Sequence, residues 1–436
     1  MILTGAAIII LAIGVLPLAL STIDSAFLFI AAVYNAAVVL AVITDYRRAP
    51  DASKLFVERE CEEELSMGEP NQILLRVRNL GDIPATIDVR DETPVDFNCS
   101  ENTARVSVPA HAELEHIYLM EPYARGDFQF GDIYIRSYGK LGLAARQFKI
   151  PSARHIRVYP DILQAKKYDL ARRRGRLMEI GSHRTKFLGI GTEFESLRDY
   201  QPDDEYRRID WKASARRARL TSRQYQLDRT QNILLVLDAG RTMCVSLDGM
   251  TKLDYAINAA LMLAYVASSG DDKVGMLVFS DEINSYLPPR RGRGHFLNML
   301  QALYNAPFTT RESDYGFAFR FISSRWRKRS LLVVFSDLID KQSSSEIIAN
   351  LAAVSRKHLC LCVAIGDPQT NAAAVKDPAK VDEVYEQAVA IQTLQARKQA
   401  IAALAGAGVM VIDAEPSGLA SAIVGKYSEI KSRLLL

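Results

Sequence analysis

The sequence predicts an α/β protein built from three successive parts: an N-terminal hydrophobic hairpin, an all-β sandwich, and a C-terminal parallel sheet covered by helices. Two uncharged runs lie within residues 1–48. Hydrophobic side chains then follow a period of two over residues 51–160, and apolar strands alternate with amphipathic helices over 231–436. A chain of 436 residues has room for two or three domains, and 49% hydrophobic residues suffice to give them cores.

Each of the two uncharged runs is long enough to form a membrane helix. Ile2–Leu20 and Ala26–Thr44 contain no charged residue, and about 20 apolar residues cross the hydrocarbon core of a bilayer. We expect transmembrane helices at about 2–21 and 26–44, joined by the short turn Ser21–Ser25 into a hairpin. The alternative for the first run is a secretory signal peptide, but it lacks a basic start and a second span follows at once.

The charges that flank the second run predict the orientation of the hairpin. Arg47 and Arg48 follow it directly, whereas the turn carries only Asp24. By the positive-inside rule the turn lies outside and everything after Tyr46 lies in the cytoplasm. We therefore expect a multi-pass protein of the inner (cytoplasmic) membrane with the bulk of the chain in the cytoplasm.

The cysteines and the small net charge argue against several classes of protein. Five cysteines, an odd number without metal-type spacing, argue against a disulfide framework and against a zinc site. Cys360 and Cys362 point to the same side of an apolar run and are expected in a strand core, which fits a reducing compartment. The formal net charge of +3 argues against a dedicated nucleic-acid binder.

Residues 51–160 are expected to form the β-sandwich. Short apolar or alternating runs, such as Ile73–Arg78 and Thr86–Arg90, are broken by turn signals at Asn79–Asp82 and Asp91–Pro94. Strands at this spacing are typical of a sandwich of about 100 residues. We interpret this part as a spacer or interaction domain, because no catalytic side chains cluster in its sequence.

Residues 161–230 are rich in charge. Residues 161–229 hold 17 basic and 11 acidic side chains, and the signs are interleaved, which favours internal ion pairs over a phosphate-binding face. A helix is expected at Asp161–Ile180, and its bunched arginines leave contact with anionic lipid headgroups as the alternative. Gly189, Gly191 and Thr192 could cradle a phosphate, but a Walker lysine is missing.

Residues 231–436 are expected to form the parallel sheet, because fully apolar strands that alternate with helices are typical of α/β folds. The first strand is predicted at Asn232–Asp238, and helices are predicted at Lys252–Ser269, Tyr315–Arg325 and Asp382–Ala405. Such sheets bind ligands at the carboxyl ends of their strands. Asp238, Asp337 and Asp413 end predicted strands, and Asp367 follows another strand after one glycine. Carboxylate and hydroxyl oxygens at such an edge suit magnesium. The alternative for Asp238 is that it caps the helix that follows.

The charged segment and the α/β part together resemble the bacterial domain-of-unknown-function 58 family. The matching segments are Gly191–Phe194, Leu197–Tyr200, Arg207–Ala215, Thr251–Asp254, Pro288–Gly292 and Ser336–Asp337. From the first to the third of these segments, the signature residues are Gly191, Thr192, Glu193, Arg198, Tyr200, Asp203, Arg208, Asp210, Trp211 and Lys212. The β part is similar to the family at Arg125–Gly126 and Gly139–Leu143, so the resemblance covers nearly the whole chain.

The resemblance implies a von Willebrand factor A-like, Rossmann-like parallel sheet in the last domain. Members of that fold commonly carry a metal-ion-dependent adhesion site, with an Asp-x-Ser-x-Ser motif, a Thr and a later Asp. The positions that match are Asp238, Thr242, Ser313 and Asp337, whereas Gly240 stands where the first Ser is expected and has no side-chain oxygen. The resemblance thus implies a degenerate site, with magnesium as the candidate cofactor.

The resemblance implies a role rather than a reaction, because such proteins resemble partners of MoxR-type AAA+ ATPases. We therefore expect a membrane-anchored, non-enzymatic adaptor that docks such an ATPase or a client in envelope-linked assembly or maturation. Two alternatives stay open: a magnesium-dependent hydrolase that uses Asp238 and Asp337, and a lipid-surface sensor that uses the basic region Arg172–Arg219. The six histidines form no recognisable pair or triad, which disfavours the hydrolase.

Overall fold

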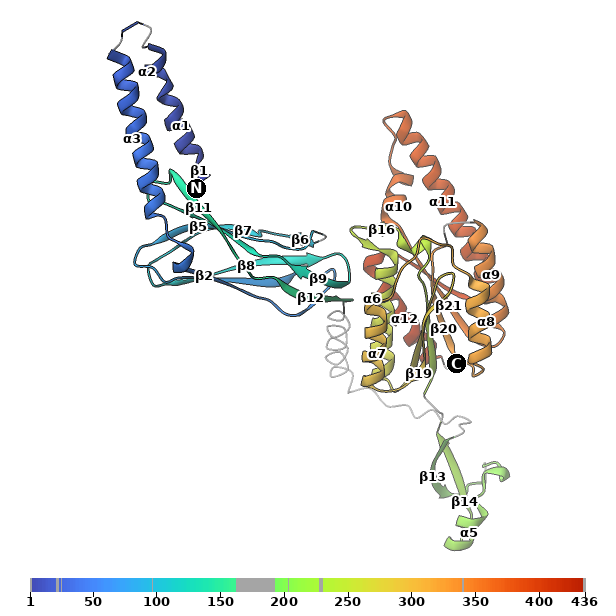
Figure 1. Cartoon of the computed structure of the whole chain (residues 1–436). Helices are drawn as coiled ribbons and strands as arrows, with labels where there is room; N and C mark the ends of the chain where they lie inside the picture. The colour runs from blue at the N-terminus through green and yellow to red at the C-terminus, as the bar shows by residue number, and fades with distance from the viewer. Residues whose placement is uncertain are drawn as a thin grey trace. The chain divides into compact units, whose positions relative to one another are not determined.

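The computed structural model describes residues 2–20, 23–24, 26–95, 97–161, 193–202, 204–226, 230–338 and 341–433. The chain divides into two compact units, Met1–Asp161 and Ile162–Leu436, and each is described by itself (Figure 1). Of the helix expected from residue 161 to residue 180, only Asp161 is among the described residues. The signature residues Gly191, Thr192 and Asp203 also lie outside them.

The first unit begins with the hydrophobic helices α1 (Gly5–Ile13), α2 (Val15–Leu20) and α3 (Ala26–Arg48) (Figure 1). The α3 helix is long and apolar enough to cross a membrane, whereas the apolar stretch Gly5–Leu20 is shorter. The prediction that the first helix begins at Ile2 is wrong. Ile2 and Leu3 form a short strand, because the Thr4 side chain accepts a hydrogen bond from Ala7 N and donates one to Gly142 O (2.7 Å).

Polar side chains of α3 hold it against the first helices. Tyr34 Oη donates to Ile10 O (2.9 Å), and Asn35 Nδ2 donates to Ala31 O (2.8 Å) and Gly14 O (3.4 Å). A Cβ atom at Gly14 would lie 2.5 Å from Asn35 Oδ1, so the close approach of the helices requires glycine there.

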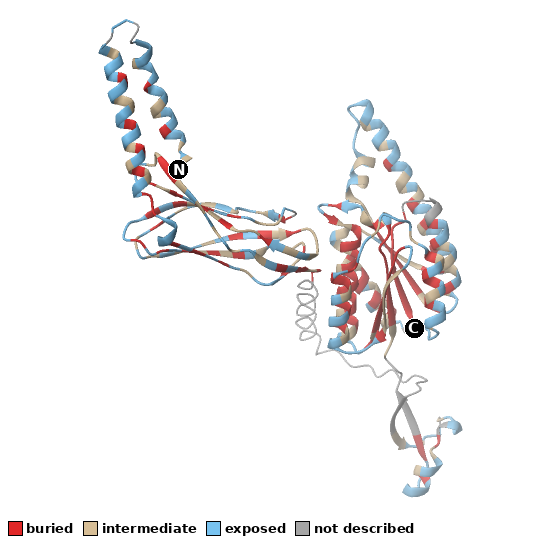
Figure 2. Cartoon of the chain, viewed as in Figure 1, coloured by how far each residue is buried: buried red, intermediate tan, exposed pale blue. Residues whose placement is uncertain are grey.

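The rest of the first unit is an all-β region with sandwich-like sheets, as predicted. One sheet has the order β1-β11-β10-β5-β7, the second β2-β4-β8-β6, and a third β3-β12-β9. Alternate residues of the strands are buried, which produces the period of two in the sequence (Figure 2). The strands are β1 (Ile2–Leu3), β2 (Leu55–Glu60), β3 (Glu64–Ser66), β4 (Asn71–Asn79), β5 (Ala85–Asp91), β6 (Phe97–Cys99), β7 (Thr103–Val108), β8 (Glu113–Pro122), β9 (Gly126–Phe130), β10 (Ile133–Tyr138), β11 (Ala144–Ile150) and β12 (Arg154–Tyr159).

The second unit begins with a small antiparallel hairpin that the sequence reasoning missed. Strands β13 (Glu193–Asp199) and β14 (Thr221–Gln226) pair, and the helix α5 (Trp211–Arg217) lies between them in the sequence. Asp210 caps α5 by accepting from Ala213 N (3.0 Å). The described signature residues between Glu193 and Lys212 therefore lie in this hairpin, in its helix and in the segment that joins them.

The main part of the second unit is a six-stranded mixed sheet covered by helices, with the order β19-β18-β15-β20-β21-β22. All neighbours are parallel except the edge strand β19, which is antiparallel to β18. The order reverses between β15 and β20, which is the switch point where such sheets bind ligands. The strands are β15 (Asn232–Asp238), β18 (Lys273–Phe279), β19 (Ile283–Arg290), β20 (Leu331–Phe335), β21 (Leu359–Ile365) and β22 (Met410–Ala414).

Helices cover both faces of this sheet, and its strands are almost wholly buried (Figures 1 and 2). One face carries α6 (Lys252–Ser269), α7 (Arg293–Tyr304) and α12 (Leu419–Ser432). The other face packs against α8 (Tyr315–Arg325), α9 (Lys341–Ser355) and α11 (Val381–Gly406). The predicted strand core positions of Cys360 and Cys362 are confirmed, since both thiols are buried in β21 and free.

The connection between β21 and β22 holds the helix α10 (Pro368–Val375), which the sequence reasoning did not predict, followed by α11. Asp367 caps α10 by accepting from Gln369 N (2.9 Å), so this acid has the capping role weighed for Asp238. Figure 1 shows the two helices projecting beyond the end of the sheet.

Candidate functional site

Asp238 lies at the carboxyl end of β15, at the switch point of the sheet, and is fully buried. Its Oδ1 atom accepts from Gly240 N (2.9 Å) and Ser313 Oγ (2.5 Å). Its Oδ2 atom accepts from Tyr315 Oη (2.5 Å) and Ser336 Oγ (2.9 Å). Four donors therefore satisfy this carboxylate without a cation.

The Tyr315 hydroxyl remains a donor at any physiological pH. Burial, together with the negative charge of Asp238, raises the pKa of Tyr315 well above its ordinary value. The protonated phenol and the Ser336 hydroxyl also contact one another, with 2.8 Å between their oxygens. These groups hold Asp238 as a hydrogen-bonded anchor of the strand end rather than as an exposed ligand.

Ser313 occupies the space that a side chain at position 240 would need. A Cβ atom at Gly240 would collide with Ser313 Oγ and lie 3.1 Å from the carbonyl oxygen of Arg311. Ser313 thus supplies, from a neighbouring loop, the hydroxyl that a serine at position 240 would have offered. That hydroxyl donates to Asp238.

Asp337 follows β20 and forms a separate, buried ionic cluster. Lys252 Nζ lies 2.5 Å from Asp337 Oδ2, and Arg397 Nη1 lies 3.2 Å from Asp337 Oδ1. Arg397 also pairs with Asp413, at 2.6 Å, on the end of β22. Burial raises the pKa of Asp337, and the two cations oppose that rise.

Lys252 is the most unusual member of this cluster. It occupies the first position of α6, which a capping box of Thr251 and Asp254 begins, and only 1% of its side chain is exposed. A cation in the first turn opposes the helix dipole, so an isolated lysine there would be unfavourable. The carboxylate of Asp337 compensates the charge, which places an ammonium group beside the acid that was expected to bind a metal.

The residues present do not fit magnesium. Asp238 has its lone pairs engaged by four donors, and Asp337 faces an ammonium and a guanidinium group. Thr242 lies half-buried on the short turn Arg241–Cys244, two residues after Gly240. Among the described residues, no group of three or more His, Cys, Asp or Glu side chains could hold a metal ion.

The sequence reasoning found the two acids and Ser313 but missed the residues that neutralise them. The sequence pattern placed Tyr315, Lys252 and Arg397 in helices. It did not indicate that the Tyr315 hydroxyl, or the charges of the other two, would contact the acids at the strand ends. A signal was available for Lys252, because a lysine opens an otherwise apolar helix immediately after its capping threonine. Nothing in the local sequence of Arg397 points to Asp337, which lies 60 positions away.

Some signature residues and their neighbours form ion pairs and an aromatic row on the β13–β14 hairpin and on the segment that joins its strands. Arg198 pairs with Asp204, and Arg219 pairs with Asp199 (2.8 Å), as the interleaved charges predicted. The rings of Tyr200, Tyr206 and Trp211 follow one another with centroids 6.3 Å and 6.5 Å apart. Lys212 is exposed, and Glu193 and Arg208 lie in β13 and in the turn Tyr206–Arg208.

The fold consists of an N-terminal apolar helix, an all-β region and a mixed α/β region. Asp238 and Asp337, at the carboxyl edge of the main sheet, are neutralised by contacts within the chain. Residues 196–405 match the model of the family described as Protein of unknown function DUF58. This part of the chain is therefore similar to the family that the sequence resembles.

Two relatives to which this chain is similar are bacterial proteins that are named as uncharacterized. Rv1480 of Mycobacterium tuberculosis (strain ATCC 25618 / H37Rv) is 28% identical over 191 residues, which are 43% of this chain and 59% of the relative. YeaD of Bacillus subtilis (strain 168) is 25% identical over 191 residues, which are 43% of this chain and 44% of the relative. The match thus spans less than two thirds of either relative.

Solved structures give weak likenesses. The Escherichia coli alpha-2-macroglobulin fragment from domain MG7 to the C-terminus is 18% identical over 26% of this chain and 17% of its own, with a TM-score of 0.22. The CARDB domain of the PF1109 protein from Pyrococcus furiosus is 14% identical over 26% of this chain and 90% of its own, with a TM-score of 0.19. Likenesses at this level carry no argument about function.

Proposed function

We propose that the protein is a membrane-tethered, non-enzymatic adaptor whose α/β domain docks a protein partner at the carboxyl edge of its sheet. The partner class is a MoxR-type AAA+ ATPase, as the family resemblance implies, acting in envelope-linked assembly or maturation. The observation that carries the proposal is the internal neutralisation of Asp238 and Asp337. Because both acids at this edge are occupied by internal contacts, the edge suits the binding of a partner rather than catalysis.

The strand order supports a von Willebrand factor A-like assignment for this domain. Numbered along the main sheet, the strands run 3-2-1-4-5-6, and the third strand is antiparallel at the edge. The first and fourth strands then end in Asp238 and just before Asp337, which are the positions that the resemblance assigns to the adhesion site. In this chain, Lys252 sets a fixed positive charge beside Asp337, one of the positions that the resemblance assigns to the adhesion site.

The docking surface that we favour is the projecting hairpin of α10 and α11. Val381 and Tyr385 lie one turn apart on α11 and are 73% and 70% exposed. Acidic side chains at Asp382 and Glu386 flank them, so a partner with apolar side chains surrounded by basic ones would fit. The same helix reaches the ionic cluster through Arg397, which ties the projection to the edge of the sheet.

The α3 helix supports the membrane tether, because its length and apolar composition suffice to cross a bilayer. In the topology that we propose, α1, α2 and α3 form a hairpin with both ends in the cytoplasm. The hydrogen bonds of Tyr34 and Asn35 to the first helices support a hairpin that enters the bilayer as one body.

A pull-down of the full chain from native membranes tests the proposal. In the presence of ATP, we expect an AAA+ ATPase to co-purify with the wild type and to fall at least about tenfold with Val381→Asp/Tyr385→Asp. Val95→Asp is the matched control, since Val95 is 99% exposed on the first unit, and it should leave recovery unchanged. Recovery of no AAA+ ATPase, or equal recovery by all three proteins, would refute the docking proposal.

The hydrolase alternative has a separate test. Turnover of a panel of phosphoesters by the purified protein, abolished by Asp238→Ala, would favour an enzyme. The thiol of Cys244 does not supply an activated nucleophile, because burial and the charge of Asp238 raise its pKa. The lipid-sensor alternative requires salt-sensitive binding to anionic vesicles that is lost when arginines of residues 172–219 are replaced.

A further inference from the structure

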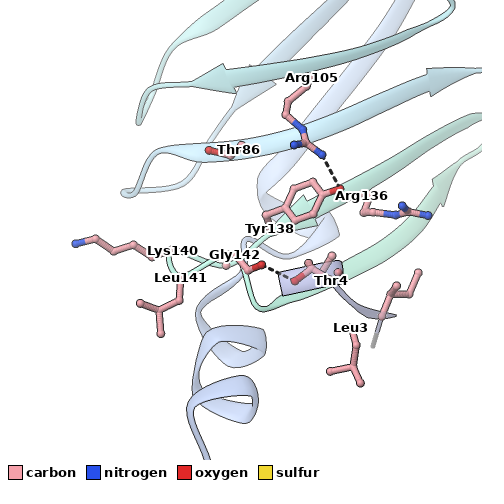
Figure 3. A pocket seen from close by; sticks show the side chains of 13 residues that line it. Leu3, Thr4, Thr86, Arg105, Arg136, Tyr138, Lys140, Leu141 and Gly142 are labelled. Carbon is pink, nitrogen blue, oxygen red and sulfur yellow. Dashed lines mark hydrogen bonds between the residues drawn. The ribbon is translucent and has the colours of Figure 1, made fainter. Parts of the chain in front are cut away.

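A basic hollow lies at the foot of the hydrophobic helices, on the first unit. Its volume is about 570 Å³, and β1, β5, β7, β10 and the loop between β10 and β11 line it. Figure 3 shows Arg105 and Tyr138 at its centre, with Arg136 on one side and Lys140 and Leu141 on the other. The lining therefore combines three cations with hydroxyl groups and one apolar tip.

The hollow is fixed at the level where the helices leave the β region. Asp45, in the last turns of α3, is buried and accepts from Leu141 N (2.7 Å), Leu143 N (2.8 Å) and Ala144 N (3.1 Å). Thr4, which begins α1, donates to Gly142 O on the same loop. Both helix ends thus hold this loop, so the loop and the hollow lie at headgroup depth once the helices are embedded. This step rests on the proposed membrane tether.

The charge of the hollow is uncompensated. Asp88 pairs with Arg105 and also accepts from Tyr138 Oη (2.5 Å), which neutralises one cation. Arg136 donates to the neutral side chain of Gln147 (3.3 Å). Neither Arg136 nor Lys140 forms an ion pair with a described carboxylate, so two net positive charges remain beside the helix ends. Such charges attract anionic lipids at about 1 kcal/mol each near a bilayer surface.

We propose that this hollow binds the phosphate-bearing headgroup of an anionic phospholipid. The guanidinium groups of Arg105 and Arg136 can donate to phosphate oxygens from two sides, and Lys140 adds charge. Leu141 is 64% exposed at the tip of the loop and inserts at the boundary of the acyl chains. The occupant is a membrane lipid rather than a soluble phosphate, because the helix ends place the opening beside the bilayer.

Native mass spectrometry of the full chain in detergent tests the proposal, with dioleoyl phosphatidylglycerol and dioleoyl phosphatidylcholine as probes. We expect tighter retention of the glycerol lipid. Arg136→Gln/Lys140→Gln should weaken that retention on the order of tenfold and leave the choline lipid unaffected. The matched control is Arg154→Gln/Arg157→Gln, which removes two cations from β12 outside the hollow and should leave both lipids unaffected.

Equal affinity of wild type and Arg136→Gln/Lys140→Gln for phosphatidylglycerol would overturn the proposal, as would an equal loss in the control. Displacement of the lipid by millimolar inorganic phosphate would overturn the lipid assignment in favour of a soluble anion. Alkaline extraction of membranes tests separately whether the chain is tethered to the bilayer. Release of the wild type by that treatment would defeat the proposed tether, whereas the detergent titration would still report on the hollow itself.

Discussion

Replacement of Lys252 by methionine tests whether its ammonium group takes the role of a cation at the edge of the sheet. The substitution keeps an unbranched side chain, one atom shorter, but removes the charge that pairs with Asp337 at 2.5 Å. Removing one partner of a buried pair costs roughly 3–5 kcal/mol, because the other charge is left buried. Arg397 remains 3.2 Å from Asp337, so the lower end of that range is expected.

The assay is thermal unfolding of the full chain followed by the fluorescence of Trp326. Its indole N–H donates to Ser330 Oγ (2.6 Å), so it reports on the α/β domain, and Trp211→Phe removes the other tryptophan. The unfolding midpoint falls by about 2–4 °C for each kcal/mol of lost stability. A loss of about 3 kcal/mol therefore lowers it by on the order of 10 °C. Lys426→Met, which breaks a partly exposed pair with Glu429, is the control and should change the midpoint by no more than about 2 °C.

Two further measurements sharpen the test. The double variant Lys252→Met/Asp337→Leu should recover part of the lost stability, since an apolar pair of similar volume removes the uncompensated charge. Magnesium at millimolar concentration should not raise the midpoint of the wild type, because a ligand that does not bind the native state adds no stability. Unchanged stability of Lys252→Met, or a clear rise of the wild-type midpoint with magnesium, would refute the reasoning.

Three more substitutions probe other contacts. Gly240→Ser should destabilise the protein by about 1–3 kcal/mol, because the new Cβ collides with Ser313, and thermal melts in magnesium should reveal no gain; a magnesium-dependent rise would contradict this. Asp45→Ala should leave three loop N–H groups without their acceptor and speed limited proteolysis at the β10–β11 loop; an unchanged cleavage rate would argue against the clamp. Hydrogen bonding to Arg105 lowers the folded-state pKa of Asp88, so this stabilisation is present above the unfolded pKa near 3.8 and is lost as pH falls through the folded value. Arg105→Gln should therefore lose less stability than wild type in melts between about pH 5 and pH 2, and equal losses would contradict the pairing.

Much of the architecture follows from patterns along the chain. The strand Asn232–Asp238 and the helices Lys252–Ser269 and Tyr315–Arg325 have the predicted bounds, because each is a long run of one period between clear boundary signals. The start of α1 was placed wrongly at Ile2. Apolar composition cannot distinguish a helix from a strand in two residues, and the pairing of β1 with β11 decides the matter.

The candidate site was predicted less completely, since its chemistry depends on distant residues. The pattern of apolar strands placed Asp238 and Asp337 at one edge, as expected for acids that follow parallel strands of a sheet, and the family resemblance added Ser313. It could not show that Ser313 fills the space beside Gly240, or that Lys252 lies against Asp337, 85 positions later in the chain.

The sequence by itself determined the apolar helix, the all-β region and the α/β region, because hydrophobic periodicity reflects which face of each element is buried. It also determined that acids would gather at the carboxyl edge of a parallel sheet. Only the tertiary structure decided what those acids do. Helices α6 and α11 bring Lys252 and Arg397 to Asp337, and a loop brings Ser313 to Asp238. A buried carboxylate takes its role from the charges packed against it, and that packing arises when the chain folds.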